Sequence, residues 1–242
     1  MSPDPLLSVE NVVKRFGGFR ALDQVSFHLR AGEVLGLVGP NGSGKTTCIN
    51  VISGLYAPDG GRVLYRSRSI GGTAAHRLAR QGINRTFQSP KPFLSLTVRE
   101  NVEIAATYGN TGAPPDLDEL LASLALDGFA ERPAGELNSA QQKTLDLGRA
   151  LATSPRLLLV DELAAGLNPA ELGRMADRLR ALAANGMALL VVEHLMGFID
   201  RVTDRVVVMA SGKEFFGGTL ADATRDPEVI RVFLGGGDHA DG

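Results

Sequence analysis

A glycine-rich stretch, Gly39 to Thr47, has residue types and spacing that suit the binding of phosphate groups. It reads Gly-Pro-Asn-Gly-Ser-Gly-Lys-Thr-Thr and fits the phosphate-loop (P-loop) pattern G-x-x-x-x-G-K-[ST] at each fixed position. Glycines let successive backbone N–H groups point inward, and a helix N-terminus adds positive partial charge. In this pattern Lys45 reaches the β- and γ-phosphates, and the Thr46 hydroxyl binds Mg²⁺. We expect the nucleotide to be held by Gly39, Pro40, Asn41, Gly42, Ser43, Gly44, Lys45, Thr46 and Thr47.

The alternative is a glycine-rich turn with an incidental lysine. The flanks argue against it, because residues 34–38 are typical of a short buried strand and residues 46–52 of the first turns of a helix. The sequence therefore predicts a site for a nucleoside triphosphate.

Two adjacent carboxylates, Asp161 and Glu162, follow the apolar run 157–160. Continuous apolar runs are typical of buried parallel strands, and ligand sites in α/β folds lie at the carboxyl ends of such strands. We therefore expect this Walker B strand to bring both side chains to the edge that carries the P-loop. Asp161 would hold Mg²⁺, directly or through water, and Glu162 would be the general base or orient the attacking water. The alternative is a solvated Asp-Glu pair that opens the next loop.

Three further residues are candidates with weaker local signals. His194 follows a second apolar run, 187–192, and could contact the γ-phosphate or the attacking water, although a lone histidine at a strand end is more often structural. Gln88 ends a predicted strand just before two prolines, which suits a mobile loop with a ligand contact or an ordinary solvated loop. Phe16 precedes a Gly-Gly turn and is either a core or strand-edge residue or a stacking partner for adenine.

The elements that must position these residues predict an α/β fold. Residues 6–38 have the alternation and turn signals of antiparallel strands that lead into the P-loop strand. A strand is predicted at 83–87, and helices are predicted at 97–107, where Thr97 and Glu100 form a capping-box pattern, and at 116–126.

These elements indicate a P-loop NTPase core with an N-terminal antiparallel β subdomain and an inserted helical subdomain at about residues 90–150. We expect a single domain over 6–234 and a flexible glycine-rich tail at 235–242.

Composition sets limits on partners and location. The 242 residues are 44% apolar and 21% charged, as in a globular protein with a sizeable core. The formal net charge of −2 gives no electrostatic case for a nucleic-acid partner, and none is expected. No apolar run approaches the roughly 20 residues that span a bilayer, and the first residues lack the pattern of a signal peptide. The lone Cys48 cannot form an internal disulfide, which favours a reducing cytoplasm.

Taken in order, the motifs resemble those of the ATP-binding subunit of an ABC transporter, from about residue 7 to residue 234. Phe16 lies at the position of that family's adenine-stacking aromatic. Gln88 matches the Q-loop glutamine, which in the family touches Mg²⁺ and links the site to membrane subunits. His194 matches the switch histidine, and residues 166–169 lie at the D-loop position. The signature segment, which acts on ATP held by the opposite subunit, corresponds to Asn138, Ser139, Ala140 and Gln141.

The resemblance implies a set of partners and a mechanism. Two subunits, identical or different, would pair head to tail with ATP between one P-loop and the other's signature. Closure would pull on ABC permease membrane subunits through the Gln88 loop, and a periplasmic binding protein would take part indirectly. The resemblance also implies that the chain lies on the cytoplasmic face of the cell membrane as a peripheral subunit, with ATP and Mg²⁺ as cofactors.

Within the family, residues 164–169, 193–196, 15–18 and 226–230 look most like the ATPases of branched-chain amino acid importers. Importers of urea or amides and exporters of lipopolysaccharide share much of this pattern. Soluble ABC ATPases of DNA repair or translation usually carry coiled-coil insertions or two cassettes, and this chain has neither. A non-hydrolysing nucleotide-binding partner in a heterodimer is the remaining alternative.

The chain departs from the family pattern in three places. Ser139 and Ala140 replace the two glycines of the usual Leu-Ser-Gly-Gly-Gln signature, and the Ala140 methyl lies where backbone must approach phosphate closely. We therefore expect weaker closure, or one impaired site in a heterodimer. Leu163 stands where proline is usual, and the loop between Tyr108 and Asp116 is short for the importer group.

Overall fold

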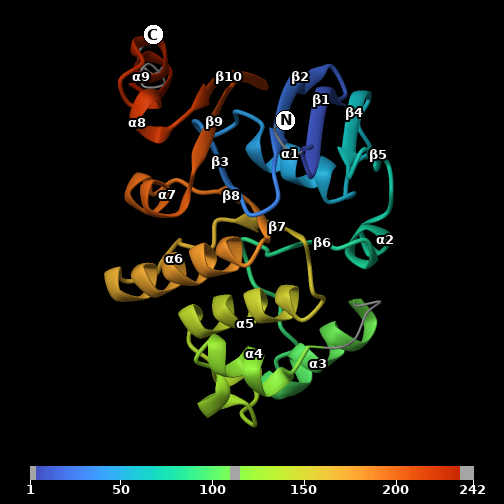
Figure 1. Ribbon diagram of the computed structural model, residues 1–242, viewed down its shortest axis with the longest axis vertical. Helices are drawn as coiled ribbons and strands as arrows, with labels where there is room; N and C mark the ends of the chain where they lie inside the picture. The colour runs from blue at the N-terminus through green and yellow to red at the C-terminus, as the bar shows by residue number, and fades with distance from the viewer. Residues whose placement is uncertain (1–3, 110–114, 235–242) are drawn as a thin grey trace.

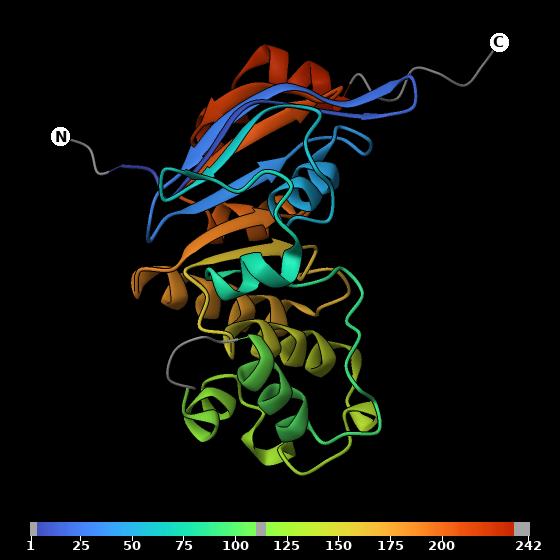
Figure 2. The same ribbon diagram turned by 90° about the vertical axis from the view of Figure 1, so that its right-hand side faces the viewer.

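The computed structural model describes residues 4–109 and 115–234. The predicted flexible tail, 235–242, therefore lies outside the described residues, as does most of the short loop after Tyr108. Two β-sheets and a group of helices lie in successive layers along the long axis of the molecule (Figures 1 and 2). No helix within the described ranges is both long and apolar enough to cross a bilayer.

The N-terminal strands form a four-stranded antiparallel sheet in the order β2-β1-β4-β5. Its strands are β1 (Leu7–Phe16), β2 (Phe19–Leu29), β4 (Gly60–Tyr65) and β5 (Arg68–Ser69). Alternation along β2 buries Val25, Phe27 and Leu29 and turns the residues between them outward. The predicted antiparallel β structure at the N-terminus is confirmed.

The second sheet has six strands in the order β10-β9-β3-β8-β7-β6. They are β3 (Val34–Val38), β6 (Ile83–Arg85), β7 (Leu157–Asp161), β8 (Ala188–Val192), β9 (Arg205–Ala210) and β10 (Lys213–Gly218). All neighbours are parallel except β10, which runs antiparallel to β9. Asp161 pairs with Val192, and Val192 also pairs with Leu37, so the ends of β7, β8 and β3 meet at one edge.

The helices occupy both sides of this second sheet and the far end of the molecule. They are α1 (Lys45–Ile52), α2 (Ala75–Arg80), α3 (Val98–Gly109), α4 (Leu117–Ser123), α5 (Ser139–Leu151), α6 (Pro169–Ala184), α7 (Met196–Val202), α8 (Leu220–Ala223) and α9 (Pro227–Leu234), with short 3₁₀ turns at Asp127–Phe129 and Ala134–Glu136. Helices α3, α4 and α5 lie at the opposite end from the four-stranded sheet (Figure 1).

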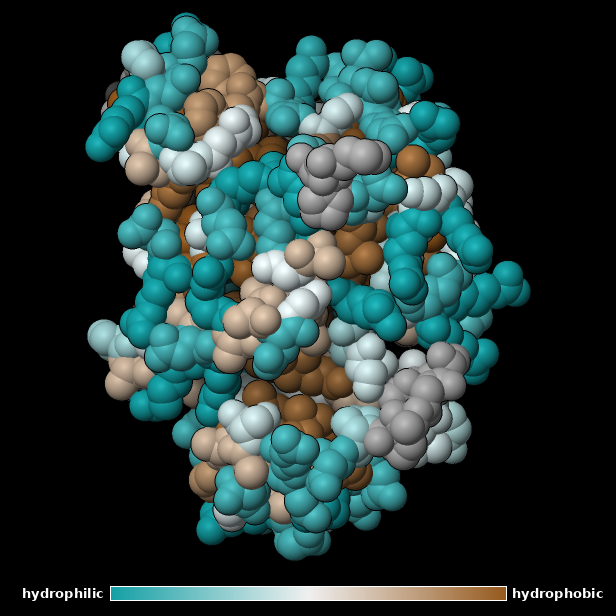
Figure 3. Space-filling view, viewed as in Figure 1, coloured by the Kyte–Doolittle hydropathy of each residue, from teal (hydrophilic) through white to brown (hydrophobic). Residues whose placement is uncertain are grey.

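Two hydrophobic clusters follow from the alternation of the parallel strands. Leu157 and Leu159 of β7 pack with α1 and the antiparallel sheet. Leu158 and Val160 face the other way and join the cluster formed by α3, α5, α6 and α7. The face shown in Figure 3 is largely hydrophilic but has several hydrophobic areas. A hydrophobic hollow of about 290 Å³ lies between α7, α8 and α9.

Two predicted boundaries are wrong, for identifiable local reasons. The strand predicted at 83–87 ends at Arg85, because the backbone N–H of Asp161 donates to the Thr86 side-chain hydroxyl instead of to a backbone carbonyl, so the ladder between the two strands is not continued. The helix predicted at 116–126 ends at Ser123, because Ala125 takes a left-handed conformation with φ 54°. The predicted capping box at the start of α3 is confirmed by reciprocal hydrogen bonds between Thr97 and Glu100.

Candidate active site

The P-loop connects β3 to α1, as predicted. Gly39 and Gly44 take positive φ angles of 147° and 104°. A side chain on Gly39 would lie 2.1 Å from the Met209 carbonyl oxygen, so only glycine fits there. Helix α1 begins at Lys45 with no side-chain cap and no acidic residue in its first turn. Its first backbone N–H groups are therefore available to an anion.

Lys45 is buried against the loop that carries it. Its Nζ donates to the carbonyl oxygens of Gly39 and Pro40, each at 2.8 Å. Burial lowers the pKa of the Lys45 ammonium, and the nearby charges of Glu162 and Asp161 raise it. The three charged groups therefore lie in one electrostatic environment, which agrees with the predicted meeting of the P-loop and the Walker B strand.

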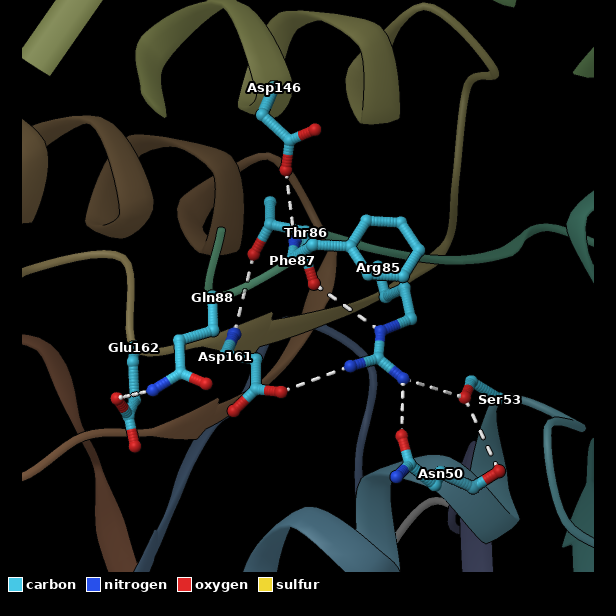
Figure 4. A network of polar contacts seen from close by, with 9 residues as sticks. All are labelled: Asn50, Ser53, Arg85, Thr86, Phe87, Gln88, Asp146, Asp161 and Glu162. Atoms are coloured by element: carbon cyan, nitrogen blue, oxygen red, sulfur yellow. Dashed lines mark hydrogen bonds and ion pairs between the residues drawn. The ribbon is translucent and has the colours of Figure 1, made fainter. Parts of the chain in front are cut away.

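Glu162 is the centre of a hydrogen-bonded group made of three predicted site residues. Its Oε1 lies 2.9 Å from Nε2 of His194, and its Oε2 accepts from Nε2 of Gln88 at 2.5 Å. Figure 4 shows the Gln88 amide pointing at the Glu162 carboxylate. Glu162 has φ 48°, a left-handed conformation that costs a non-glycine residue about 1–2 kcal/mol and persists only where the surroundings enforce it.

Asp161 lies beside Glu162 at the end of β7 and is almost completely buried. Its Oδ2 accepts from the Arg85 guanidinium at 3.0 Å, and its backbone N–H donates to the Thr86 hydroxyl at 3.3 Å. Burial raises the pKa of the Asp161 carboxyl, while the Arg85 charge lowers it. The ion pair fixes one oxygen of Asp161 and leaves the other for a ligand.

Arg85 and Asp146 are neighbours of the site that sequence reasoning missed. Arg85 also donates to Asn50 and Ser53 at the end of α1, and its guanidinium lies over the Phe87 ring. Asp146 of α5 accepts the Phe87 backbone N–H at 2.9 Å. The consecutive residues 85–88 therefore contact α1, the carboxylates of Asp161 and Glu162, and α5 (Figure 4). Neither residue gives a local signal in the sequence, because Arg85 lies between Asn84 and Thr86 and Asp146 lies in a helix with several other polar residues.

The predicted signature segment lies at the start of α5. Asn138 caps the helix: its Oδ1 accepts the Gln141 N–H, and the Gln141 side chain accepts the Asn138 N–H. Ser139 and Ala140 lie in the first turn and are not among the described residues with positive φ. The two replaced glycines therefore cause no backbone strain within this chain. The cap uses Oδ1 of Asn138, so the side-chain NH₂ group of Asn138 is left to donate a hydrogen bond.

Phe16 lies at the end of β1, with 45% of its surface exposed. Its ring meets the ring of Tyr56 edge to face, with centroids 5.2 Å apart. Lys14 Nζ lies 5.6 Å from the same ring. Phe16 is therefore a supported surface aromatic and not a core residue.

The predicted Mg²⁺ ligands offer a hydroxyl (Thr46), an amide oxygen (Gln88) and a carboxylate (Asp161). Oxygen donors of this kind suit Mg²⁺, which is usually bound by one or two protein groups together with phosphates and water. Among residues 4–109 and 115–234, no group of three or more His, Cys, Asp or Glu side chains could hold a metal by itself. The hydroxyl, amide and carboxylate oxygens by themselves fit an Mg²⁺ ion that arrives with a nucleotide.

Residues 22–165 match the family model described as ABC transporter. The chain belongs to the ABC transporter family. A probable branched-chain amino acid transport ATP-binding protein, LivG, of Archaeoglobus fulgidus is 36% identical over 248 residues, covering 96% of this chain and 96% of the relative.

Two solved structures add to this result. An ATP-binding cassette of an ABC transporter in its ADP conformation matches with a TM-score of 0.87 and 34% identity, covering 96% of this chain and 100% of that chain. A dimeric cassette in a post-hydrolysis state, bound to ADP and Pi, matches with a TM-score of 0.79 and 26% identity, covering 88% of this chain and 98% of that chain.

These similarities confirm the predicted fold class and general activity. The chain is the ATP-binding subunit of an ABC transporter and an ATP hydrolase. ABC ATPases dimerise and work with membrane permease subunits.

Proposed function

We propose that this chain powers the uptake of branched-chain amino acids as an ATPase subunit at the cytoplasmic face of the cell membrane. The chemistry rests on one observation, the Glu162 carboxylate held between Gln88 and His194. The solute rests on the similarity to the Archaeoglobus fulgidus protein, together with the importer-like residues 164–169 and 193–196.

Glu162 is the proposed general base. A carboxylate that is fixed at both oxygens can orient a water for in-line attack on the γ-phosphate and accept its proton. His194 holds Oε1 of Glu162 and lies exposed at the same edge, where it can also contact the γ-phosphate. Glu162 and His194 are therefore the proposed catalytic residues.

The nucleotide is held by the P-loop and by Phe16. Lys45 exchanges the carbonyls of its own loop for the β- and γ-phosphates, since its three N–H donors require acceptors in either state. The adenine stacks on Phe16, whose orientation Tyr56 supports. Thr46, Gln88 and Asp161 are the proposed Mg²⁺ ligands; when bound, the ion neutralises charge on the phosphate oxygens.

The working unit is proposed to be a head-to-tail dimer with an identical or different ATP-binding subunit. Asn138, Ser139, Ala140 and Gln141 of one subunit then face the γ-phosphate held by the other. The N-terminus of α5 supplies backbone N–H groups for this contact, and the Ala140 methyl restricts the approach. The helical segment at about 90–150 is the proposed moving part of a single domain that spans 6–234.

The permease is proposed to dock on a groove of about 330 Å³ between the Gln88 loop and the helical segment. Phe87, Phe93 and Tyr108 line this groove and are exposed to 46%, 47% and 75%. The same strand-to-loop segment carries Gln88, so a partner seated there would act on Glu162 through one hydrogen bond. A periplasmic binding protein would act through the permease.

Co-purification from membranes, followed by reconstitution, tests this proposal. We expect permease subunits to accompany the chain and leucine to stimulate ATP hydrolysis by the complex. If only urea, an amide or lipopolysaccharide stimulates hydrolysis, that compound would replace branched-chain amino acids as the proposed solute. Absence of hydrolysis in the intact complex would favour the alternative, a weakly active nucleotide-binding partner.

A further inference from the structure

Lys143 lies in α5, two residues after the signature segment, and its side chain reaches the turn that follows the Walker B strand. It is buried, with 7% of its surface exposed. Its Nζ donates to the carbonyl oxygens of Glu162 at 3.2 Å, Leu163 at 3.2 Å and Ala165 at 2.5 Å. An ammonium has three N–H donors, and these three carbonyls use all of them.

Glu193 holds the same turn through a backbone N–H group. It is 2% exposed, and its Oε1 accepts the backbone N–H of Ala164 at 2.6 Å. The backbone N–H of Glu162 donates to the Val192 carbonyl at 2.9 Å. The turn 162–165 is therefore bound at its carbonyls by Lys143, at one N–H by Glu193 and at another by the end of β8.

Burying an ammonium without a compensating partner is costly, and burial lowers the pKa of Lys143. The charges of Glu193 and Glu162 act in the opposite direction. The three carbonyl oxygens and the nearby carboxylates therefore offset the cost of burying the Lys143 ammonium. The proposed nucleotide contacts use neither Lys143 nor Glu193.

The contacts of Lys143 and Glu193 with this turn affect the backbone conformation of Glu162, which is part of the turn. Its left-handed backbone is unfavourable in isolation and needs support from its surroundings. This backbone determines where the carboxylate points, and the carboxylate meets both Gln88 and His194. A displacement of about 1 Å at a reacting group can cost about 100-fold in rate.

We propose that Lys143 and Glu193 are positioning residues for Glu162: together they hold the turn 162–165 in the conformation that aims the Glu162 carboxylate. The inference rests on the catalytic role proposed for Glu162. Lys143 belongs to α5, the helix that starts with the signature segment. A shift of α5 would therefore also move the turn that carries Glu162.

The test measures steady-state ATP hydrolysis by the whole chain in matched variants. Lys143→Met keeps the side-chain length but removes the charge and the donors, whereas Lys143→Arg keeps both. We expect Lys143→Met to lower kcat about 10- to 100-fold with less than about a 3-fold change in KM for ATP, and Lys143→Arg to recover most of the loss. Unchanged kcat in Lys143→Met would overturn the proposal.

Glu193 offers a second matched pair. Glu193→Gln keeps the acceptor for the Ala164 N–H, and Glu193→Leu removes it. We expect a loss of kcat in the leucine variant and near-normal kcat in the glutamine variant. Equal losses in both would contradict positioning by this hydrogen bond.

A double-mutant cycle with Glu162→Gln separates positioning from general structural damage. If Lys143 acts through Glu162, adding Lys143→Met to Glu162→Gln lowers the residual rate by less than about 2-fold. A loss as large as in the wild-type background would overturn the proposal. Should Lys143→Met fail to fold, the same cycle with Glu193→Leu decides the question. Wild-type turnover in Glu162→Gln alone would instead refute the role of Glu162.

Discussion

The Arg85–Asp161 ion pair gives a prediction whose size follows from burial. The two groups are 3.0 Å apart, and their side chains are only 10% and 6% exposed. Removing one partner of a buried pair leaves the other charge uncompensated, which costs about 3–5 kcal/mol. We therefore expect Arg85→Met to lower the free energy of unfolding at pH 8 by about this amount.

An exposed ion pair provides the control. Arg62 and Glu10 lie 2.7 Å apart, but their side chains are 69% and 36% exposed. Exposed pairs contribute about 0–1 kcal/mol, so Arg62→Met should be nearly neutral despite its shorter contact. Urea unfolding of the whole chain, followed by circular dichroism, compares the two variants directly.

The cost of Arg85→Met should also depend on pH. Burial raises the folded-state pKa of Asp161, and losing Arg85 removes the nearby charge that lowers it. The folded variant then binds a proton at Asp161 more tightly than the unfolded chain does. The destabilisation of Arg85→Met is fully present above the raised pKa of Asp161 and is lost as pH falls through that pKa. The difference in unfolding free energy between Arg85→Met and wild type should therefore be smaller at pH 5 than at pH 8. A cost no larger than that of Arg62→Met, or one equal at both pH values, would refute the reasoning.

Three other predictions concern separate parts of the chain. Burial raises the pKa of the Cys48 thiol to about 12, so a thiol reagent at pH 8 should leave Cys48 unmodified until denaturant unfolds the protein; rapid modification of the native chain would contradict this. Asn168 caps α6 in a capping box with Glu171, and Asn168→Ala should cost about 1 kcal/mol in urea unfolding, whereas a loss below about 0.3 kcal/mol would argue against the cap. The double change Ser139→Gly with Ala140→Gly should increase ATP-dependent dimerisation, measured by light scattering, and ATP turnover, measured by phosphate release. If neither increases, Ser139 and Ala140 do not weaken closure of the dimer.

The convergence of Asp161, Glu162 and His194 could be predicted from sequence because it depends on local patterns. Each residue follows an apolar run typical of a buried parallel strand, and the carboxyl ends of such strands share an edge. The P-loop could also be predicted from sequence, because its glycines, lysine and threonine form one continuous motif.

The supporting contacts could not be predicted in this way, because their partners lie far apart in the sequence. Arg85 and Asp161 are separated by 76 residues, and Ala164 and Glu193 by 29. Lys143 gave no local signal, since a lysine on a helix next to two glutamines is usually solvated. The capping of α5 by Asn138 was also missed, although Asn138 and Gln141 have the spacing of a capping box.

The most direct test of the account is ATP turnover by Glu162→Gln, with ATP affinity measured on the same preparation. Glutamine keeps the size of the side chain and can still contact Gln88 and His194, but it cannot accept the proton. We expect turnover to fall about 100- to 10,000-fold while ATP affinity changes by less than about 3-fold. Wild-type turnover in this variant would contradict the central claim that Glu162 is the base.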